Sequence, residues 1–298
     1  MGNEKLPLSH FLLALAVVAV WGSNFVVIKL ALFNLPPLLF AALRFTFALL
    51  PAIFFLPKPK VSWLNLAAYG FFIGVGQFGL LYIAVQSHIS AGLSSVVVQS
   101  QAFFTIGLAM YFARERIAQF QLIALLVCLI GLGIIAGHTD QNTDFLGLTL
   151  VLIGALSWGL GNTVSRNAGK VNMLSYVVWS SIFSVIPLII LSLVFEGWDL
   201  IEASLAGLNG PLWAAILWQS WGNTLFGFAA WAWLLARHPA AVVAPISLLV
   251  PILGVGSAAI FLSEPLPLWK ITAATLVITG LGINMYWPIF KARLQGRM

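Results

Sequence analysis

Long apolar segments recur from one end of this chain to the other, and they constrain its fold more than any other feature. Hydrophobic residues make up 61% of the 298 residues and charged residues only 7%. The segments are roughly 18 to 25 residues long, the length with which an α-helix crosses the hydrocarbon core of a bilayer. The sequence therefore predicts an all-α membrane protein and excludes a separate soluble domain. The ten expected helices cover residues 8–31, 36–56, 62–86, 91–112, 117–136, 145–167, 173–195, 211–235, 240–262 and 267–289.

The second half of the chain repeats the first. Early matches between the halves share one separation along the chain, and later matches share a slightly larger one, so the second copy contains a short insertion. We divide the chain into a first repeat, residues 1–140, and a second repeat, residues 141–298. The matched positions are Trp21 with Trp158, Lys29 with Arg166, Glu115 with Glu264, and Gly131-Leu132-Gly133 with Gly280-Leu281-Gly282.

The number of helices in each repeat predicts how the two copies are oriented. Each half holds five of the ten expected helices, and because five is odd, the second copy enters the membrane from the opposite side. Inverted repeats are typical of secondary transporters, in which two similar halves enclose a solute site near the midplane. The sequence therefore predicts a transporter built from two inverted five-helix repeats.

The basic residues predict the orientation in the membrane. Most of the 14 lysines and arginines fall at one side if the helices simply alternate. By the positive-inside rule this side is cytoplasmic, so both termini are expected in the cytoplasm. The net charge of +6 is then a topological signal, because the basic residues are scattered singly and not concentrated on one nucleic-acid-binding surface.

Six motifs along the chain carry a resemblance to a known family. They are Trp21-Gly22-Ser23-Asn24-Phe25-Val26-Val27-Ile28-Lys29, Pro36-Pro37-Leu38, Leu43-Arg44-Phe45, Gln99-Ser100-Gln101-Ala102-Phe103-Phe104-Thr105, Glu115-Arg116, and Ala244-Pro245-Ile246-Ser247-Leu248-Leu249-Val250-Pro251. These motifs resemble the EamA branch of the drug/metabolite transporter superfamily, and the resemblance covers nearly the whole chain. It implies a bundle of two times five helices in the bacterial inner membrane, a central cavity, and rocking between inward-open and outward-open states. The residues look most like the members that export cysteine and O-acetylserine, while neighbouring branches move aromatic amino acids, other metabolites or drugs.

Polar side chains at one depth of the bilayer mark a candidate site, because polar groups are costly in hydrocarbon. Counting the helical rise from the helix ends places a set of polar and tryptophan residues within roughly two turns of the midplane. Trp179, Ser180 and Gln219 share this depth. The candidate substrate-binding residues are Trp21, Asn24, Arg44, Gln77, Gln101, Trp158, Asn162 and Asn223.

A zwitterionic amino-acid metabolite needs a cation for its carboxylate and carbonyl oxygens or an aromatic face for its ammonium. Arg44 supplies the cation in this interpretation, and it has the alternative of bonding backbone carbonyls at a helix end or snorkelling outward. Asn24 and Asn162 supply amide oxygens, or else hold the bundle together by interhelical hydrogen bonds. Gln99 lies about 200° from Gln101 on an ideal helix, so we place only Gln101 in the site.

Four prolines suggest hinges. Pro51 and Pro187 match across the repeats, and Pro245 and Pro251 lie in the ninth expected helix. A missing backbone hydrogen bond permits either a gating hinge or a static bend.

Glycines suggest where two helices cross. Gly131, Gly133, Gly280 and Gly282 lie on the fifth and tenth expected helices, and small residues permit close helix packing. A homodimer seam is the alternative, so the protein is expected to be a monomer or a homodimer in contact with membrane lipid.

Missing residue types narrow the mechanism. No Asp or Glu lies inside an expected span, so no buried carboxylate is available as a proton carrier, and uniport or exchange fits as well as proton antiport.

Cys128 is the only cysteine and lies without a histidine at its depth, so a thiol nucleophile is unsupported. No metal-ligand spacing or Gly-rich phosphate loop appears, so the sequence predicts no enzyme, no cofactor and no metal. A channel or a lipid-handling scaffold is the alternative of another class.

Overall fold

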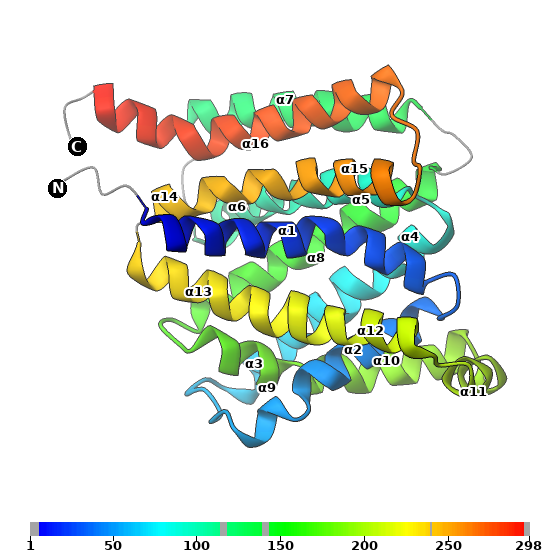
Figure 1. Cartoon of the computed structure of the whole chain (residues 1–298). Helices are drawn as coiled ribbons and strands as arrows, with labels where there is room; N and C mark the ends of the chain where they lie inside the picture. Colours follow the sequence, from blue (N-terminus) through cyan, green and yellow to red (C-terminus); the bar gives the residue numbers. More distant parts are fainter. Residues whose placement is uncertain (1–5, 114–117, 139–142, 239, 295–298) are drawn as a thin grey trace.

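The computed structural model describes residues 6–113, 118–138, 143–238 and 240–294, and the described chain is helical without a β-strand. Glu115, which the repeat pairs with Glu264, lies outside the described residues. Figure 1 shows the helices running side by side in one bundle. The elements are α1 (Leu8–Ala31), α2 (Pro37–Leu49), η1 (Ala52–Phe54), α3 (Trp63–Gly70), η2 (Phe71–Gly79), α4 (Leu80–Ser87), α5 (Ala91–Val97), η3 (Val98–Ser100), α6 (Gln101–Ala113), α7 (Gln119–Ala136), α8 (Phe145–Asn167), α9 (Met173–Ser180), α10 (Ile182–Phe195), α11 (Trp198–Ala206), α12 (Gly210–Leu217), η4 (Trp218–Phe226), α13 (Gly227–Arg237), α14 (Ala240–Val243), η5 (Ala244–Leu248), α15 (Leu249–Phe261) and α16 (Leu268–Leu294).

Eight helical segments of the described chain are long and apolar enough to cross a membrane. A ninth is counted if the bent pair Trp198–Ala206 and Gly210–Arg237 forms one span. The segment expected at residues 240–262 contains a shorter apolar helix, Ile246–Phe261. By length and composition, eight or nine segments of the described residues therefore suit a multi-pass membrane protein.

Helix α11 (Trp198–Ala206) was not expected from the sequence. It meets the following helical segment at an angle of 107°, so it does not continue that span. Trp198 and Leu200 are exposed on it, and Asp199 lies in its first turn. A short helix with acidic residues has no long apolar run and therefore carries no signal for a membrane-crossing segment.

Irregular turns interrupt the helices at matching places in the two halves. The π-helical segments η2 and η4 have the same length and begin at Phe71 and Trp218. Helices α6 and α15 also have the same length, begin at Gln101 and Leu249, and each follow a 3-10 segment. The number of residues between η2 and η4, and between α6 and α15, lies between the spacing of the early sequence matches and that of the late ones. The irregular segments therefore occur at the positions that the sequence repeat predicts.

The four expected hinge prolines lie in different settings. Pro51 follows the end of α2 at Leu49, so the expected helix 36–56 is interrupted there. Pro187 lies inside α10, Pro245 lies in the 3-10 segment η5, and Pro251 lies in α15. Because proline lacks an amide hydrogen, Pro187 interrupts the backbone hydrogen-bond ladder inside α10, whereas Pro51 precedes η1 and Pro245 lies in the first turn of η5, where that hydrogen has no partner within the segment.

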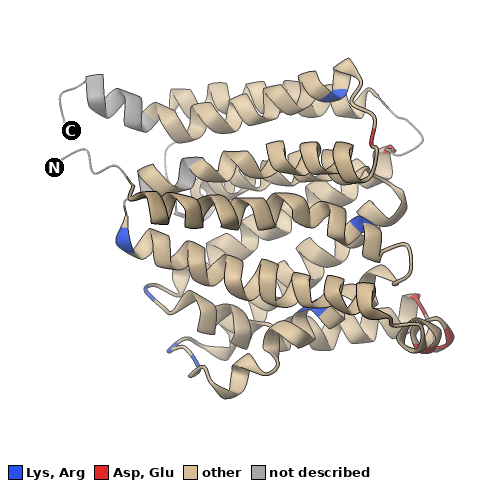
Figure 2. Cartoon of the chain, viewed as in Figure 1, with Lys and Arg blue, Asp and Glu red and all other residues tan. Residues whose placement is uncertain are grey.

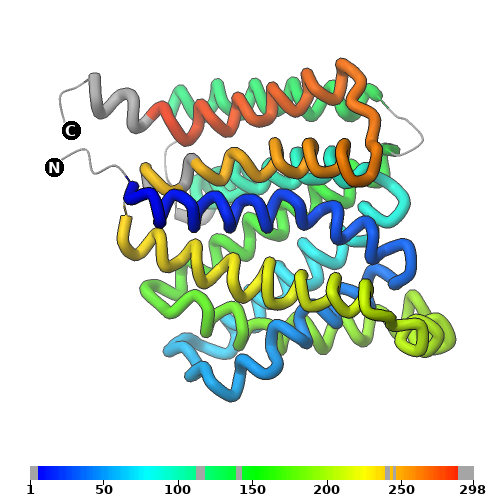
Figure 3. The backbone as a smooth tube through the Cα atoms, in the orientation of Figure 1, coloured from blue at the N-terminus to red at the C-terminus, as the bar shows by residue number. Residues whose placement is uncertain are grey.

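The arrangement of the bundle follows from close helix contacts. Helix α1 lies between α13 and α15, and α7 lies beside α16 at one side of the bundle, as Figures 1 and 3 show. At the α7–α16 crossing, a Cβ atom on Gly280 would lie 2.6 Å from the carbonyl oxygen of Ala124. A Cβ atom on Gly131 would lie 2.9 Å from the carbonyl oxygen of Ala273. The expected close crossing is therefore confirmed for these two glycines.

The other two glycines of the pattern do not lie in that crossing. A Cβ atom on Gly133 or Gly282 would have no neighbouring atom within 4 Å. The prediction that they pack between the two helices was wrong. Each is two residues, about 200° on an ideal helix, from the glycine that does form the crossing.

Candidate functional site

Arg44 lies in the middle of α2, and its guanidinium is completely buried. Nη1 donates to Oη of Tyr82 at 3.1 Å and to Oε1 of Gln219 at 2.9 Å. Nη2 donates to Oδ1 of Asn223 at 2.8 Å and to Oγ1 of Thr224 at 3.0 Å. We call these five residues the Arg44 cluster. It joins α2 to α4 and η4 through side chains, so in this structure Arg44 neither bonds backbone carbonyls at a helix end nor snorkels.

The environment of the guanidinium is apolar apart from those four acceptors. Its central carbon lies 3.6 Å from the centroid of the Phe78 ring and 5.6 Å from that of Phe45. Nε is buried without a hydrogen-bond partner. Among the described residues, the structure contains no ion pair between Arg44 and a carboxylate.

A second polar cluster joins α8 to α6. Nδ2 of Asn162 donates to Oε1 of Gln101 at 3.0 Å and to Oγ1 of Thr105 at 3.1 Å. All three side chains are partly buried. Trp158 lies one turn before Asn162 on α8 and packs against the core. We call these four residues the Asn162 cluster.

The two clusters lie on separate helices, although the sequence placed their members in one layer. No hydrogen bond between described residues joins the Arg44 cluster to the Asn162 cluster. Gln77 is buried on the π-helical segment η2 and takes part in the hydrogen bonds of neither cluster. Gln99 is also buried, in the 3-10 segment η3 that immediately precedes Gln101.

Trp21 and Asn24 lie on the buried side of α1. Nε1 of Trp21 donates to the backbone carbonyl of Asn223 at 3.2 Å, and its ring lies 5.3 Å from that of Trp231. Asn24 is 4% exposed, and its Oδ1 is buried without a hydrogen-bond partner. The structure thus brings Trp21 next to Asn223, and it leaves on Asn24 an acceptor that no protein donor satisfies.

A small cavity adjoins Arg44, and a larger one lies apart from the candidate residues. One is small, about 10 Å³, and its wall includes Arg44, Ser180 and Thr224. The other has about 700 Å³ and lies between the α1–α2 connection, α4, α10 and α11. Its walls are mainly apolar, with Asn34 and Gln86 among the polar residues. The larger cavity has the size of a small-molecule site but contains none of the eight candidate residues.

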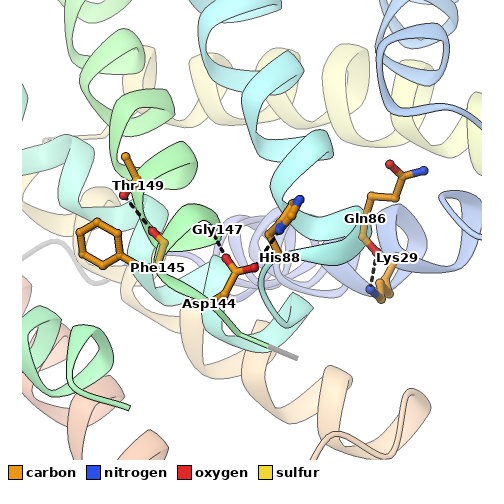
Figure 4. Close-up of polar contacts among 7 residues, drawn as sticks. All are labelled: Lys29, Gln86, His88, Asp144, Phe145, Gly147 and Thr149. Carbon is orange, nitrogen blue, oxygen red and sulfur yellow. Dashed lines mark hydrogen bonds and ion pairs between the residues drawn. The ribbon is translucent and has the colours of Figure 1, made fainter. Parts of the chain in front are cut away.

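Charged residues are divided between the two ends of the bundle. Figure 2 shows lysine and arginine mainly at the end where α1 starts and α13 finishes, and aspartate and glutamate at the opposite end. At that acidic end, Nζ of Lys29 donates to the carbonyl of Gln86 at 2.9 Å, as Figure 4 shows, and to that of Val85 at 2.9 Å. A cation at the carboxyl end of α4 is favourable because that end carries a partial negative charge.

Carboxylates at the same end accept hydrogen bonds from the first amides of two helices. Glu264 accepts from the amides of Ala91 and Gly92 at 2.7 and 3.1 Å at the start of α5. Glu196 accepts from the amides of Leu38 and Leu39 at 2.6 and 3.0 Å at the start of α2. These bonds satisfy backbone amides that the helices themselves leave free.

Asp144 connects two helices at this end. It caps α8 by accepting from the amide of Gly147 at 2.7 Å, and its Oδ2 lies 2.8 Å from Nδ1 of His88 (Figure 4). The hydrogen bond from His88 and the backbone amides lower the pKa of the Asp144 carboxyl below its usual value. His88 thereby ties the end of α4 to the start of α8.

Sequence reasoning missed three partners of these clusters. Thr105 follows Gln101 by four residues, a spacing that puts both on one helix face and that would have identified it. Thr224 adjoins Asn223, but it lies on a different helical segment from Arg44, so sequence spacing could not pair them. Tyr82 looks like an ordinary core residue in the sequence, and only its contact with Arg44 in the structure reveals its role.

The chain matches known proteins over nearly its whole length. Residues 8–137 and 145–286 each match the model of the EamA-like transporter family. A protein of Salmonella typhimurium described as a "Probable amino-acid metabolite efflux pump" is 39% identical over 292 residues, covering 96% of this chain and 97% of that protein. A protein of Escherichia coli K12 with the same description is 38% identical, covering 92% and 94%.

A solved crystal structure supports the fold. It has a TM-score of 0.63 and 16% sequence identity, and the match covers 94% of this chain and 97% of that one. At this identity the likeness bears on the fold alone. Family match, relatives and helical architecture agree, and the chain belongs to the EamA-like transporter family.

Proposed function

We propose that this transporter exports small amino-acid metabolites, with cysteine and O-acetylserine as its solutes. Two relatives that align over more than nine-tenths of their length are described as amino-acid metabolite efflux pumps, which supports the solute class. The choice of cysteine and O-acetylserine within that class rests on the resemblance of the sequence motifs.

The mechanism we propose is alternating access between two inverted five-helix repeats, residues 1–140 and 141–298, with ten spans. The matched π-helical segments η2 and η4 and the matched helices α6 and α15 support two copies of one unit. The separation of basic and acidic residues supports an orientation with both termini in the cytoplasm of a bacterial cell. Pro187 and Pro251 then lie within helices α10 and α15, which would have to bend as the halves rock, while Pro51 follows α2 and Pro245 precedes α15.

The hydrogen bond between Asn162 and Gln101 is the main support for placing the solute site here. These residues belong to different repeats, and their amides are partly buried, with the indole of Trp158 one turn before Asn162 on α8. Their carbonyl oxygens and the ring suit the ammonium group of an amino acid. On the first helix, the unsatisfied carbonyl oxygen of Asn24 is a further acceptor for a solute donor, because buried polar groups rarely stay unpaired.

The remaining candidates take supporting positions in this proposal. Trp21 and Asn223 form the contact between α1 and η4, and Arg44 holds η4 against α2. Gln77 occupies the matching π-helical segment η2. We propose that these four set the shape of the site through the two irregular segments.

Efflux from proteoliposomes tests the proposal. Vesicles preloaded with labelled cysteine or O-acetylserine are compared for the unmodified protein, Asn162→Ala and Thr149→Ala, with and without a pH gradient. Thr149 is a matched control because it lies on α8 and is partly buried like Asn162, but it bonds only its own helix at Phe145. We expect saturable efflux that Asn162→Ala impairs and Thr149→Ala preserves, and the effect of the gradient reports proton coupling.

Other outcomes would redirect the assignment. Absence of efflux for both solutes from folded protein would overturn the substrate, and aromatic amino acids and drugs would be tested next. Flux that rises linearly with concentration would indicate a channel, and movement of lipid without solute would indicate a lipid-handling protein.

A further inference from the structure

We propose that Arg44 binds a small monovalent anion in the small cavity lined by residues of α2, η2, α9 and η4. Three features support this site: the charge of the guanidinium, the unpartnered donors beside it, and the position of the cavity between the two halves. It does not depend on which solute the transporter exports.

The charge of Arg44 lacks a counter-charge. The side chain is completely buried, and its four acceptors are a phenol, two amides and a hydroxyl, all of them neutral. The face of Phe78 attracts the cation but carries no net charge. Within a membrane protein, an isolated buried cation is strongly unfavourable, whereas the same cation next to an anion is not.

Two donors next to the cavity lack acceptors. Nε of Arg44 and Oγ of Ser180 are both buried without a hydrogen-bond partner, and both residues line the cavity. The hydroxyls of Ser181 and Ser184, which also line it, donate instead to the carbonyls of Val177 and Gly70 at 2.8 Å. The unmet demand is therefore for a group that accepts hydrogen bonds, as an anion does.

The size and walls of the cavity limit the ligand. A volume of about 10 Å³ admits one particle about the size of a water molecule. Much of the remaining wall is apolar, including Phe45, Ile73 and Phe228, so an anion would interact strongly with the guanidinium at low dielectric. A single halide ion fits these conditions. The carboxylate of a solute has the same chemistry and would fit only after the cavity widens.

The cavity lies where the two repeats meet. Arg44 and Ser180 are separated along the chain by the same interval as the matched prolines Pro51 and Pro187. They are therefore equivalent positions of the two halves, and both line one cavity. An anion bound to both would link α2 of the first repeat to α9 of the second.

Chloride titration of the purified full-length protein tests the proposal. Thermal unfolding is measured in sodium gluconate buffer while chloride replaces gluconate at constant ionic strength. We expect Tm to rise saturably with chloride. Ser180→Ala should raise the half-saturating chloride concentration about tenfold, because a hydrogen bond to a charged group is lost. Ser181→Ala should leave this concentration unchanged, since its hydroxyl is already bonded to its own helix.

Bromide identifies the position and source of the anion. Crystals grown with bromide should show anomalous density within hydrogen-bonding distance of Nε of Arg44. Displacement of bromide by O-acetylserine but not by its methyl ester would assign the site to the solute carboxylate, and no displacement by either would assign it to a resident halide. An unchanged Tm in chloride together with a water at this position would overturn the proposal.

Discussion

Nη2 of Arg44 donates to Oδ1 of Asn223 over 2.8 Å, and the backbone carbonyl of the same asparagine accepts from Trp21 at 3.2 Å. Asn223 therefore ties both α1 and α2 to the π-helical segment η4. Asn223→Ala removes an acceptor from a buried charged donor, so we expect the free energy of unfolding to fall by about 1–3 kcal/mol. Thermal unfolding in detergent should show a Tm several degrees lower.

Thr46→Ala provides the control on the same helix. Oγ1 of Thr46 donates to the carbonyl of Ala42 in its own helix at 2.8 Å, so its removal leaves no charged donor without an acceptor. We expect its Tm to stay within about a degree of the unmodified protein, as for changes away from buried networks. Equal Tm values for Asn223→Ala and Thr46→Ala would mean that Thr224 alone satisfies Nη2.

The α7–α16 crossing predicts opposite effects for two glycines that are two residues apart. In Gly280→Ala the new Cβ atom would lie 2.6 Å from the backbone oxygen of Ala124, and a backbone atom cannot move aside cheaply. We expect a loss of about 1–3 kcal/mol from overpacking. Gly282→Ala meets no atom within 4 Å and should leave stability unchanged or raise it by up to about 1 kcal/mol through helix propensity.

Tm values of the two alanine variants, measured side by side, check this prediction. Similar losses for both would show that glycine is needed for backbone flexibility at this point of α16 and not for its approach to α7.

Regular apolar segments were predictable because their length alone specifies a membrane-crossing helix. Residues 8–31 and 145–167 were expected as helices, and α1 (Leu8–Ala31) and α8 (Phe145–Asn167) have these bounds. Helix α11 was missed since its nine residues include Asp199 and Glu202. Its formation depends on the surrounding chain and leaves no periodic apolar pattern.

The partners within the site were less predictable than its depth. Counting along the helices placed Arg44 and Asn223 at one depth, and the structure joins them. Direction around a helix axis is harder to infer, because a period of 3.6 residues fails across the π-helical segments η2 and η4 and the 3-10 segment η3. Gln77, Asn223 and Gln101 lie in or next to these segments, so their neighbours followed only from the coordinates.

The contact between Asp144 and His88 should make the stability of the protein depend on pH. Its pKa is lowered in the folded protein, chiefly by the hydrogen bond from His88. A lowered folded-state pKa means that the carboxylate stabilises the fold above its ordinary pKa of 3.8 and that this contribution disappears as pH falls through the lower folded value. Asp144→Asn should therefore lower Tm at pH 7, and the difference should shrink as the pH falls below 3.8 toward the lower folded-state pKa.

Glu202→Gln separates this effect from a general change of charge, because Glu202 lies on α11 at the same acidic end. Tm is measured from pH 3 to pH 8 for the three proteins. The same pH-dependent difference in Glu202→Gln and Asp144→Asn would attribute the effect to net charge and contradict a specific role for the contact with His88.

Asn162 and Gln101 either bind solute or only hold α6 to α8 by their hydrogen bond. A double-mutant cycle with Asn162→Ala, Gln101→Ala and the double variant measures the energy of the hydrogen bond through unfolding, and the KM of the same variants measures solute binding. Interhelical hydrogen bonds of this kind contribute about 0.6–2 kcal/mol in membrane proteins. We expect coupling of that size in stability and, in addition, a KM for solute raised by each single substitution. A pair that only held α6 to α8 would show the coupling in unfolding with KM unchanged in the single variants, because an interaction that contacts no solute contributes no solute-binding energy.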